Sequence, residues 1–403
     1  MTKFPVVALN EVADFTRGLT YTKSDEVDFS SNIVLRANNV DLNSGTILYE
    51  DLKYLRDSFV IPSEKKVQSG SLIICTASGS KSHLGKVALI PDSIDMAFGG
   101  FMGMLRPKDV LDGRFLYYAL RSPAYLDFIS QATDGANINN LKFSDLGLFE
   151  FPLPPLDEQK RIVAKLDEAM SDLNCVEKQT SEIGDLAALF TSAVLSEEFA
   201  VSSKWPIVPL SDLTTVLTDG DWVESKDQSP SGIRLLQTGN VGLGRFRAND
   251  NRARYISAET FERLNCTEVV AGDVLISRLP DPIGRACVIP ELNERTITAV
   301  DCAVLRFKES IIPELFVYYS QSSDYLQTAE AKATGSTRQR ISRSNLSQIQ
   351  IPLPPLDEQK RIVAKLDEIS ECSSMRKDLQ NRRTESIAKL KSVILAAAFA
   401  GNL

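Results

Sequence analysis

The residues that most often perform catalysis or bind metals are scarce in this chain. His83 is the only histidine among 403 residues, which excludes a metal site built from two or three histidines within the chain. Catalytic dyads and triads that use histidine would depend on that one residue. We interpret His83, in a loop rich in Gly, Ser and Lys, as an exposed loop residue and not as a catalyst. The six cysteines contain no Cys-x-x-Cys pair, which excludes a zinc finger and predicts free thiols in a reducing cytosol.

Motifs that would hold a cofactor are incomplete. The segment Gly79–Val87 resembles a phosphate-binding loop, but it has one residue too many between its glycines and ends in valine. Leu153–Leu156 and its copy Leu353–Leu356 lack the polar and aromatic residues of a base-methylating motif. Glu158 and Lys160 match half of a nuclease motif, but acids in the first turn of a helix explain them better. We therefore expect no catalytic residue and no metal or cofactor in this chain.

Size and composition are those of an ordinary folded protein. A chain of 403 residues, with 43% apolar and 24% charged residues, predicts two or more globular domains. No apolar run reaches the roughly 18–20 residues that span a bilayer, and the N-terminus resembles no export signal, so we expect a cytoplasmic protein that binds no membrane. Because the net charge is −8, any binding of nucleic acid must come from local basic patches.

An internal repeat organises the whole chain. The 17-residue segment Pro152–Glu168 (PLPPLDEQKRIVAKLDE) recurs unchanged at Pro352–Glu368, an offset of 200 residues. Weaker matches at nearly the same offset extend the repeat upstream, such as Leu35–Val40 with Leu236–Val241. These matches predict two copies of one unit of about 200 residues, in which the first part has diverged and the last part is nearly fixed.

Each copy is predicted to be a mixed head followed by a long helix, which gives the chain an α+β fold in tandem, pseudo-symmetric repeat. Short β-rich runs in the heads alternate with Gly, Pro, Ser and Asn, the residues typical of turns. A Pro-Pro pair ends each head, and two acids then open a helix with favourable dipole interactions. The predicted heads are residues 1–156 and 201–356, and the predicted helices are residues 157–200 and 357–403.

Apolar residues of both predicted helices follow the heptad spacing of a coiled coil. The first helix keeps this spacing through Ile183 and Phe190. The middle of the second helix is polar at the expected positions, which suggests a local stutter onto Met375 and Leu379. The side chains that we expect to pair the helices or to dock a partner subunit are Leu156, Ile162, Leu166, Leu173, Phe190, Leu356, Ile362, Leu366, Ile387 and Leu390.

The charges of the two helices are complementary. Residues 157–199 contain ten acids and four bases, whereas residues 357–403 contain seven acids and nine bases. This opposite bias favours pairing of the helices with each other. A head lies between them in sequence, so the chain can return and place the helices antiparallel with a head at each end. The alternative is that each helix packs only on its own head.

Two divergent heads, each followed by PLPPLDEQKRIV and a long helix, resemble the specificity subunit of type I restriction–modification systems over the full chain. The resemblance implies that the heads are target recognition domains, each reading one half of a split, asymmetric DNA site. It implies that the helices hold the heads apart and dock two methyltransferase subunits, which restriction subunits join in the full complex. It also implies a non-catalytic chain, with S-adenosylmethionine, ATP and Mg²⁺ on the partner subunits.

Contacts to double-stranded DNA are expected from loops of the heads, because neither head contains a recognisable helix-turn-helix or finger. Residues 331–345 contain four bases and no acid, and their counterpart at residues 133–142 is rich in asparagine. Such side chains bind phosphates and read guanine or adenine edges. Solvated loops and capped turns are the alternative interpretation. The predicted DNA-binding residues are Arg36, Asn38, Asn39, Ser78, Lys81, Lys86, Asn137, Asn139, Asn140, Lys142, Gln237, Asn240, Arg278, Arg285, Arg338, Gln339, Arg340 and Arg343.

Two other classes of protein remain open from the residues alone. A scaffold with duplicated protein-binding heads would have no affinity for DNA even with its partners present. A nuclease or methyltransferase with an unrecognised site would turn over substrate without any partner. The missing cofactor motifs weigh against the enzyme, and the basic segment Arg338–Arg343 weighs against the scaffold.

Overall fold

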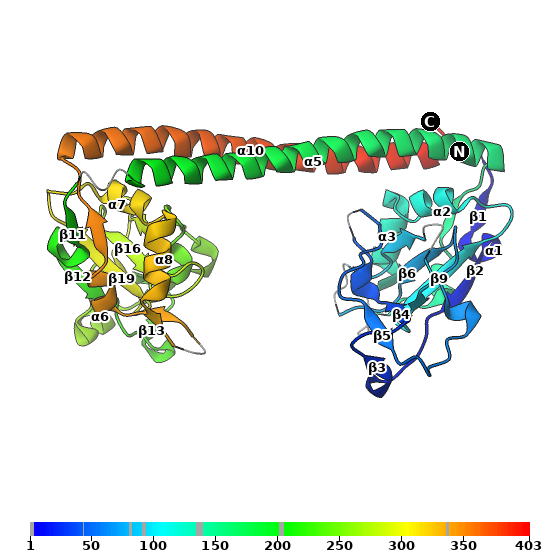
Figure 1. The fold of residues 1–403 in the computed structure, drawn as a ribbon, viewed down its shortest axis with the longest axis horizontal. Coiled ribbons are helices and arrows are strands. Elements are labelled where there is room, and N and C mark those ends of the chain that lie inside the picture. The colour runs from blue at the N-terminus through cyan, green and yellow to red at the C-terminus, as the bar shows by residue number, and fades with distance from the viewer. Residues whose placement is uncertain are drawn as a thin grey trace. The chain divides into compact units, whose positions relative to one another are not determined.

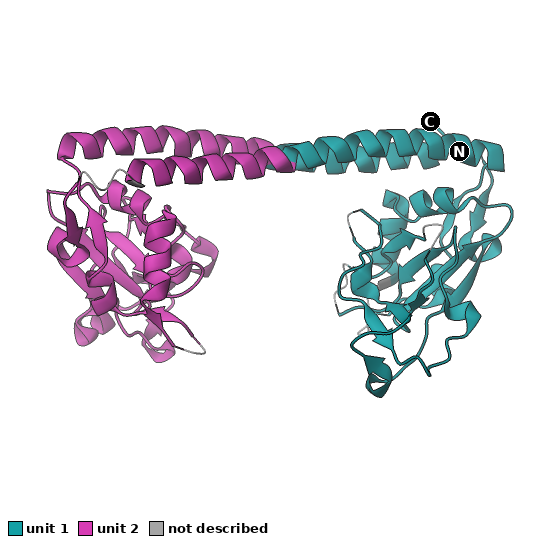
Figure 2. Cartoon of the chain, viewed as in Figure 1, with its two compact units in different colours: residues 1–180, 381–403 teal, residues 181–380 magenta. Residues whose placement is uncertain are grey.

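The computed structural model describes residues 4–42, 44–79, 83–90, 94–133, 140–200, 205–335 and 338–403. The chain forms two compact units, one of residues 1–180 with 381–403 and one of residues 181–380 (Figure 2). Each unit contains one head and parts of both long helices. The unit boundaries therefore cut through the helices, whereas the predicted division was placed at the helix ends.

The first head contains two four-stranded sheets (Figure 1). One sheet has the antiparallel order β2-β9-β6-β7, and the other has the order β3-β5-β4-β8 with a parallel β4–β8 pair. A short antiparallel pair, β1 with β10, adjoins the long helix. The elements are β1 Val6–Ala8, α1 Leu9–Val12, β2 Ala13–Arg17, η1 Lys23–Asp25, β3 Glu26–Val27, β4 Asn32–Leu35, η2 Ala37–Asn39, β5 Lys53–Leu55, η3 Ser63–Lys65, β6 Leu72–Cys75, β7 Val87–Leu89, β8 Ala97–Phe98, β9 Met102–Pro107, α2 Gly113–Ala119, α3 Pro123–Thr133, α4 Phe143–Leu146 and β10 Glu150–Pro152.

The second head repeats this topology. Its sheets have the orders β12-β19-β16-β17 and β13-β15-β14-β18, and β11 pairs with β22 as β1 does with β10. The elements are β11 Ile207–Pro209, η6 Leu210–Leu213, β12 Thr214–Asp219, η7 Ser225–Asp227, β13 Gln228–Ser229, β14 Ile233–Leu236, η8 Thr238–Asn240, η9 Asp250–Arg252, β15 Arg254–Ile256, α6 Ala258–Leu264, β16 Val274–Ser277, β17 Ala286–Val288, β18 Thr296–Thr298, β19 Cys302–Phe307, α7 Pro313–Tyr319, α8 Ser323–Ala331, β20 Ala333–Thr334, β21 Arg340–Ile341, α9 Arg343–Ser347 and β22 Gln350–Pro352. The duplicated α+β architecture predicted from the repeat is confirmed.

A long helix follows each head: α5 spans Leu156–Ala200 and α10 spans Leu356–Phe399. Both begin directly after the repeated Pro-Pro pair, with the acids Asp157/Glu158 and Asp357/Glu358 in the first turn. Negative charge there stabilises the helix dipole. Among the described residues, no helix combines the length and apolar character that crossing a membrane requires.

Within each unit, segments of α5 and α10 run antiparallel and are joined by ion pairs. In the first unit, Glu177 binds Lys391 at 2.6 Å. In the second unit, Glu198 binds Arg361 at 2.8 Å and Lys365 at 2.5 Å. Burial opposes ionisation of Glu198, but the hydrogen bonds from Lys365 and Arg361 outweigh it and hold the pKa of this carboxyl below its ordinary value. The acids lie on α5 and the bases on α10, as the charge counts predicted.

The residues of α5 that face α10 differ from the predicted heptad after Thr180. Gly184 and Thr191 are partly buried there, whereas Ile183 is exposed and Phe190 is 60% exposed. A Cβ atom on Gly184 would lie only 2.6 Å from Nε2 of Gln380. The missing side chain thus leaves room for the Gln380 side chain against the α5 backbone, and the contact surface shifts by one residue. The prediction that Phe190 pairs the helices is therefore corrected.

The predicted stutter in α10 is also wrong. Met375 is 67% exposed and Leu379 is exposed, while Ser373, Arg376 and Gln380 lie partly buried in the original heptad frame. Two of these polar side chains have partners across the pair, which makes their burial tolerable: the hydroxyls of Ser373 and Thr191 are 3.3 Å apart, and Arg376 donates to the Ile183 carbonyl at 3.4 Å. The helix pair in the second unit therefore has a polar seam.

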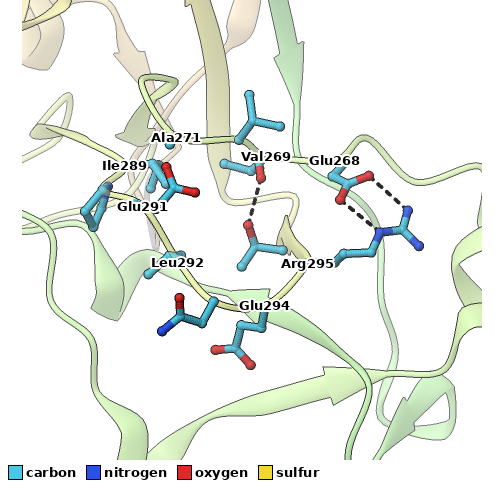
Figure 3. Close-up of a pocket in the computed structure, with 12 residues that line it drawn as sticks. Glu268, Val269, Ala271, Ile289, Glu291, Leu292, Glu294 and Arg295 are labelled. Carbon is cyan, nitrogen blue, oxygen red and sulfur yellow. Dashed lines mark hydrogen bonds and ion pairs between the residues drawn. The ribbon is translucent and has the colours of Figure 1, made fainter.

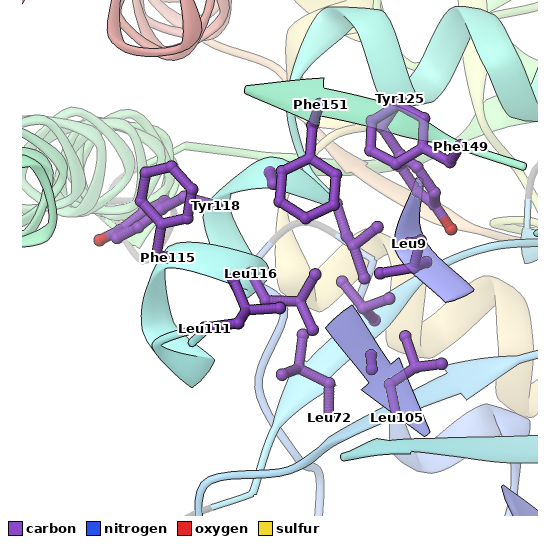
Figure 4. Packing of buried hydrophobic residues seen from close by; sticks show 14 of the residues in the cluster. Leu9, Leu72, Leu105, Leu111, Phe115, Leu116, Tyr118, Tyr125, Phe149 and Phe151 are labelled. Atoms are coloured by element: carbon purple, nitrogen blue, oxygen red, sulfur yellow. The ribbon is translucent and has the colours of Figure 1, made fainter. Parts of the chain in front are cut away.

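Each helix also packs on its own head. Pairing of the helices and packing on the heads, which were given as alternatives, therefore occur together. In the first unit, Ile162 and Leu166 belong to the core of the head, which includes Leu72, Leu105, Phe115 and Leu116 (Figure 4). Leu395 and Ala398 of α10 join the same core. In the second unit the corresponding set is Ile362 and Leu366 of α10 with Val194, Leu195 and Phe199 of α5. Burial of these side chains excludes them from docking a partner.

The repeated glutamine of PLPPLDEQ fastens each helix to its head. Gln159 is fully buried, accepts from the Asp112 amide at 2.8 Å and donates to the carbonyls of Val110 at 2.9 Å and Pro154 at 2.8 Å. Gln359 repeats this arrangement with the Ile312 amide at 2.9 Å. In the sequence, this glutamine stands out only as part of the repeat.

Replacing Gln159 by leucine is expected to lower the free energy of unfolding by about 1–3 kcal/mol, the usual cost of leaving buried polar groups unpaired. Thermal or urea unfolding, read by circular dichroism, measures the loss. Gln359→Leu provides the same test in the second unit. Lys160→Ala, one residue away on the exposed helix face, is the control and should change stability little. Equal stability of Gln159→Leu and Lys160→Ala would contradict the role assigned to this side chain.

Candidate nucleic-acid interface

Several predicted DNA-facing segments of the first head meet around one hollow. The hollow has a volume of about 690 Å³, and its lining includes Arg17, Arg36, Asn38, Ala77 and Phe101. Ala77 forms an antiparallel bridge with Asn140, and the predicted residue Ser78 follows Ala77 in sequence. Loops that are far apart in sequence therefore bring cationic, amide and aromatic groups together. We call this the first-head hollow.

Arg36 and Asn38 are both held by Asp51 at this hollow. Nη2 of Arg36 lies 2.8 Å from Oδ2 of Asp51, and Nδ2 of Asn38 donates to the same oxygen at 3.0 Å. Asp51 has a φ of 51°, which places it in the left-handed region that non-glycine residues seldom adopt. The two donors are therefore fixed in direction before any ligand arrives, while Asn38 stays exposed.

The predicted basic loop of the second head lies on the surface, and Asp301 holds two of its arginines. Arg338 binds Asp301 at 3.1 Å, and Arg340 lies 3.6 Å from the same carboxylate. Nη2 of Arg340 also donates to the Val300 carbonyl at 2.8 Å. Arg338, Gln339 and Arg343 are exposed and Arg340 is half-buried, so this loop presents three guanidinium groups on the surface of the head. We call residues 338–343 the arginine loop.

Arg278 supports the arginine loop from beneath. Its side chain is buried, donates to the Ile341 carbonyl at 2.9 Å and pairs with Asp219 at 2.5 Å. Burial lowers the pKa of this guanidinium, and Asp219 opposes that effect. The structure thus corrects the prediction that Arg278 contacts DNA, because the side chain is buried and its Nε and Nη1 donate to groups of the protein itself.

Lys86 and Arg285 are corrected in the same way. Both are buried at equivalent places in the two heads, and burial lowers the pKa of each side chain. Nζ of Lys86 donates to the Val40 carbonyl at 2.7 Å, and Nε of Arg285 donates to the Val241 carbonyl at 2.8 Å. Each cation therefore anchors the short η2 or η8 segment inside its head and does not face solvent.

Asn39 and Asn240 cap turns, the alternative interpretation given for them. Asn39 is fully buried; its Oδ1 accepts from the Arg36 amide at 2.9 Å, and its Nδ2 donates to the Glu50 carbonyl at 2.8 Å. In the second head, Oδ1 of Asn240 accepts from the Gln237 amide at 2.9 Å. Burial and these internal bonds exclude both asparagines from reading bases, whereas Gln237 stays partly exposed.

The remaining predicted positions divide between exposed residues and residues that are not described. Asn140, Lys142 and His83 are exposed, and Ser78 is half-buried. Lys81, Asn137 and Asn139 lie outside the described residues. For the exposed residues, contact with DNA stays a prediction.

Sequence reasoning missed two residues at the first-head hollow, Arg17 and Phe101, and one exposed aromatic residue of the second head, Trp222. Arg17 ends β2 at the first-head hollow, and Phe101 lies in the turn between β8 and β9. Trp222 is exposed just after β12 in the second head. Each is a single exposed residue near the end of a strand, and none belongs to a run of basic or amide residues that a motif search would detect. These residues could have been found from the sequence only by asking where the two repeats differ at equivalent positions.

A further hollow of the second head has the wrong charge for DNA. It has a volume of about 360 Å³, and Glu268, Glu291 and Glu294 lie in its lining (Figure 3). Its one guanidinium, from Arg295, is bound to Glu268 at 2.9 Å. An acidic rim repels phosphate, so we exclude this hollow from the candidate interface. Within the described ranges, no cluster of His, Cys, Asp or Glu has the makings of a metal site.

Comparison with known proteins identifies a family for both halves of the chain. A family model described as the type I restriction modification DNA specificity domain matches residues 1–185 and 176–382. The chain is 27% identical over 417 residues to the EcoKI specificity subunit of Escherichia coli K12, covering 99% of this chain and 89% of that protein. It is 26% identical over 421 residues to the StySPI specificity subunit of Salmonella potsdam, covering 98% and 88%.

Solved structures share the fold. A chain from a structure described as "Structural basis underlying complex assembly and conformational transition of the type I R-M system" matches with a TM-score of 0.77 and 24% identity, covering 100% of both chains. The HsdS subunit from Thermoanaerobacter tengcongensis matches with a TM-score of 0.53 and 24% identity, covering 99% of this chain and 97% of that chain. At this level of identity the likeness concerns the fold alone.

Proposed function

Because the chain belongs to the type I restriction–modification DNA specificity family, we propose that each of its heads reads one half of a split, asymmetric DNA site. The observation that carries this proposal is that two heads of one topology present different side chains at the same place. Arg36 and Phe101 of the first head correspond to Gln237 and Asp301 of the second. Different base-reading groups on equivalent surfaces suit two different half-sites. Family membership disfavours the scaffold alternative.

The exposed apolar side chains of the helices form two equivalent sets, which supports docking of two copies of one partner. Leu156 and Leu390 are exposed in the first unit, and their counterparts Leu356 and Phe190 are exposed in the second. Phe190 also borders a hollow of about 440 Å³ with Ile369. Contiguous exposed apolar patches mark surfaces that bind protein, and Leu186 and Leu189 are exposed beside Phe190. We assign these surfaces to two methyltransferase subunits, with the paired helices setting the gap between half-sites.

Catalysis belongs, in this proposal, to the partner subunits. The sequence supports this assignment, because its phosphate-binding, base-methylating and nuclease motifs are all incomplete. The methyltransferase subunits would carry S-adenosylmethionine. Restriction subunits that use ATP and Mg²⁺ would join them on DNA in the cytoplasm.

The isolated chain is expected to bind DNA weakly. Its net charge is −8, and three of the cations at the candidate interface, Arg36, Arg338 and Arg340, share acidic partners, so few counterions are released on binding. Adding the methyltransferase subunit of the same system should supply both affinity and methylation of adenines in a two-part motif. Gel shifts at several salt concentrations and a genome-wide methylation map measure the two effects. Tight, salt-insensitive, sequence-specific binding by the chain alone would count against the proposal.

A further inference from the structure

We infer that one residue at the tip of a turn in each head, Phe101 in the first and Asp301 in the second, contributes to the choice of bases which that head reads. The turns join β8 to β9 and β18 to β19. This inference rests on the proposed function, since it assigns specificity to particular residues within DNA recognition. Neither residue belongs to the DNA-binding set predicted from the sequence.

The backbone holds the two tips in the same way. In the first head, the Met102 amide donates to the Gly99 carbonyl at 2.9 Å, and the Thr76 amide donates to the Phe101 carbonyl at 3.0 Å. In the second head, the Cys302 amide donates to the Ala299 carbonyl at 2.9 Å, and the Arg278 amide donates to the Asp301 carbonyl at 2.9 Å. Each tip is thus fastened to the end of the neighbouring central strand, β6 or β16.

In each head a glycine packs directly on this turn: Gly18, which follows β2, and Gly220, which follows β12. A Cβ atom on Gly18 would lie 1.9 Å from the Gly99 carbonyl oxygen, and one on Gly220 would lie 2.3 Å from the Ala299 carbonyl oxygen. Only glycine permits such an approach of two backbones. The tips are therefore rigid platforms, on which the side chain can change between heads without a change in the backbone.

The side chain of Phe101 is 72% exposed at the first-head hollow, whose lining also includes the cations Arg17 and Arg36. An aromatic ring so exposed adds little to the core of the head. The neighbouring cations suit phosphates, and the ring suits an apolar base edge such as the methyl group of thymine. Phe101 is thus placed to discriminate one base pair of the first half-site.

Asp301 acts through other residues. Its two carboxylate oxygens face Arg338 at 3.1 Å and Arg340 at 3.6 Å, which fixes both guanidinium groups of the arginine loop. An acid at a DNA surface repels phosphate, so its presence among arginines suits orientation of those arginines better than general affinity. Asp301 is therefore a positioning residue for the second half-site.

The test for Phe101 is the methylation map of Phe101→Ala co-expressed with the methyltransferase subunit. We expect the preference for one base pair of one half-site to fall about 10- to 100-fold, with the other half-site unchanged. Leu148→Ala, which truncates another exposed apolar residue of the same head, is the control and should leave the map unchanged. A Phe101→Ala map identical to the parent's would overturn the inference. A parent that directs no two-part methylation would instead overturn the proposed function.

The test for Asp301 is Asp301→Asn, which removes the charge and keeps the shape. We expect a relaxed second half-site, together with equal or tighter binding of the assembled complex to unrelated DNA, because a repulsive charge is gone. Asp301→Glu should restore part of the specificity, and Glu309→Gln, an exposed acid of the same head, is the charge-matched control. A loss of methylation that is equal at all sequences would show that Asp301 acts only on folding, and would overturn its assignment.

Discussion

Replacing both Arg338 and Arg340 by alanine is expected to abolish recognition of the half-site read by the second head and to leave the other half-site intact. The reason is that these side chains are the surface guanidinium groups that Asp301 orders in the arginine loop. A base-reading arginine contributes about 1–3 kcal/mol of discrimination at its own base pair. The loss of two such contacts should therefore leave the second half of the motif nearly unread.

Single variants separate the two roles that an arginine can have. Loss of a base contact should relax one position of the motif, whereas loss of a phosphate contact should weaken all sequences alike. The measurement is the methylation map of each variant in complex with the methyltransferase subunit. Arg295→Ala is the control, because its guanidinium is bound to Glu268 at the acidic hollow of the same head. If the double variant kept the parental motif, the arginine loop would not lie at the DNA.

The duplication and the helices could be predicted from the sequence because they depend on local patterns. The unchanged segment at Pro152–Glu168 and Pro352–Glu368 marks the start of both helices, and proline and acids are strong helix signals in any surroundings. The charge bias predicted which helix supplies the acids of the interhelical ion pairs. Periodicity was less reliable, since Gly184 leaves room for the Gln380 side chain and faces α10 in place of Ile183, which shifts the contact surface away from Phe190.

The DNA-facing residues could be predicted only in part, because burial within a loop depends on distant segments. Lys86 and Arg285 are cations of the heads, as Arg36 and Arg338 are. The structure buries the first two against the carbonyls of η2 and η8, and leaves the other two near solvent. A residue type alone therefore does not separate a cation that anchors a loop from one that meets DNA. Phe101 and Asp301 occupy equivalent positions of the two repeats and differ in type. A motif search does not detect such a difference.

Lengthening both helices by four residues is expected to lengthen the gap between the half-sites by one or two base pairs. The insertions belong after Gly184 in α5 and after Gln380 in α10, because these residues lie opposite each other in the helix pair. Four residues add about 6 Å to each helix, at about 1.5 Å per residue, and turn it by about 400°. The contact face thus moves by only about 40°, so pairing is retained. Along DNA, about 6 Å corresponds to one or two steps of about 3.4 Å.

Inserting two residues at the same places is the matched control. Two residues turn each helix by about 200°, which carries the residues around Thr191 and Ser373 away from each other and should remove both pairing and methylation. The four-residue variant should instead fold and methylate the same two half-sites at the longer gap, because neither head is altered. Methylation maps read the gap, and circular dichroism reads the helix content of both variants. The assignment of the gap to the helices would be falsified if the four-residue variant folded, methylated DNA and kept the parental gap.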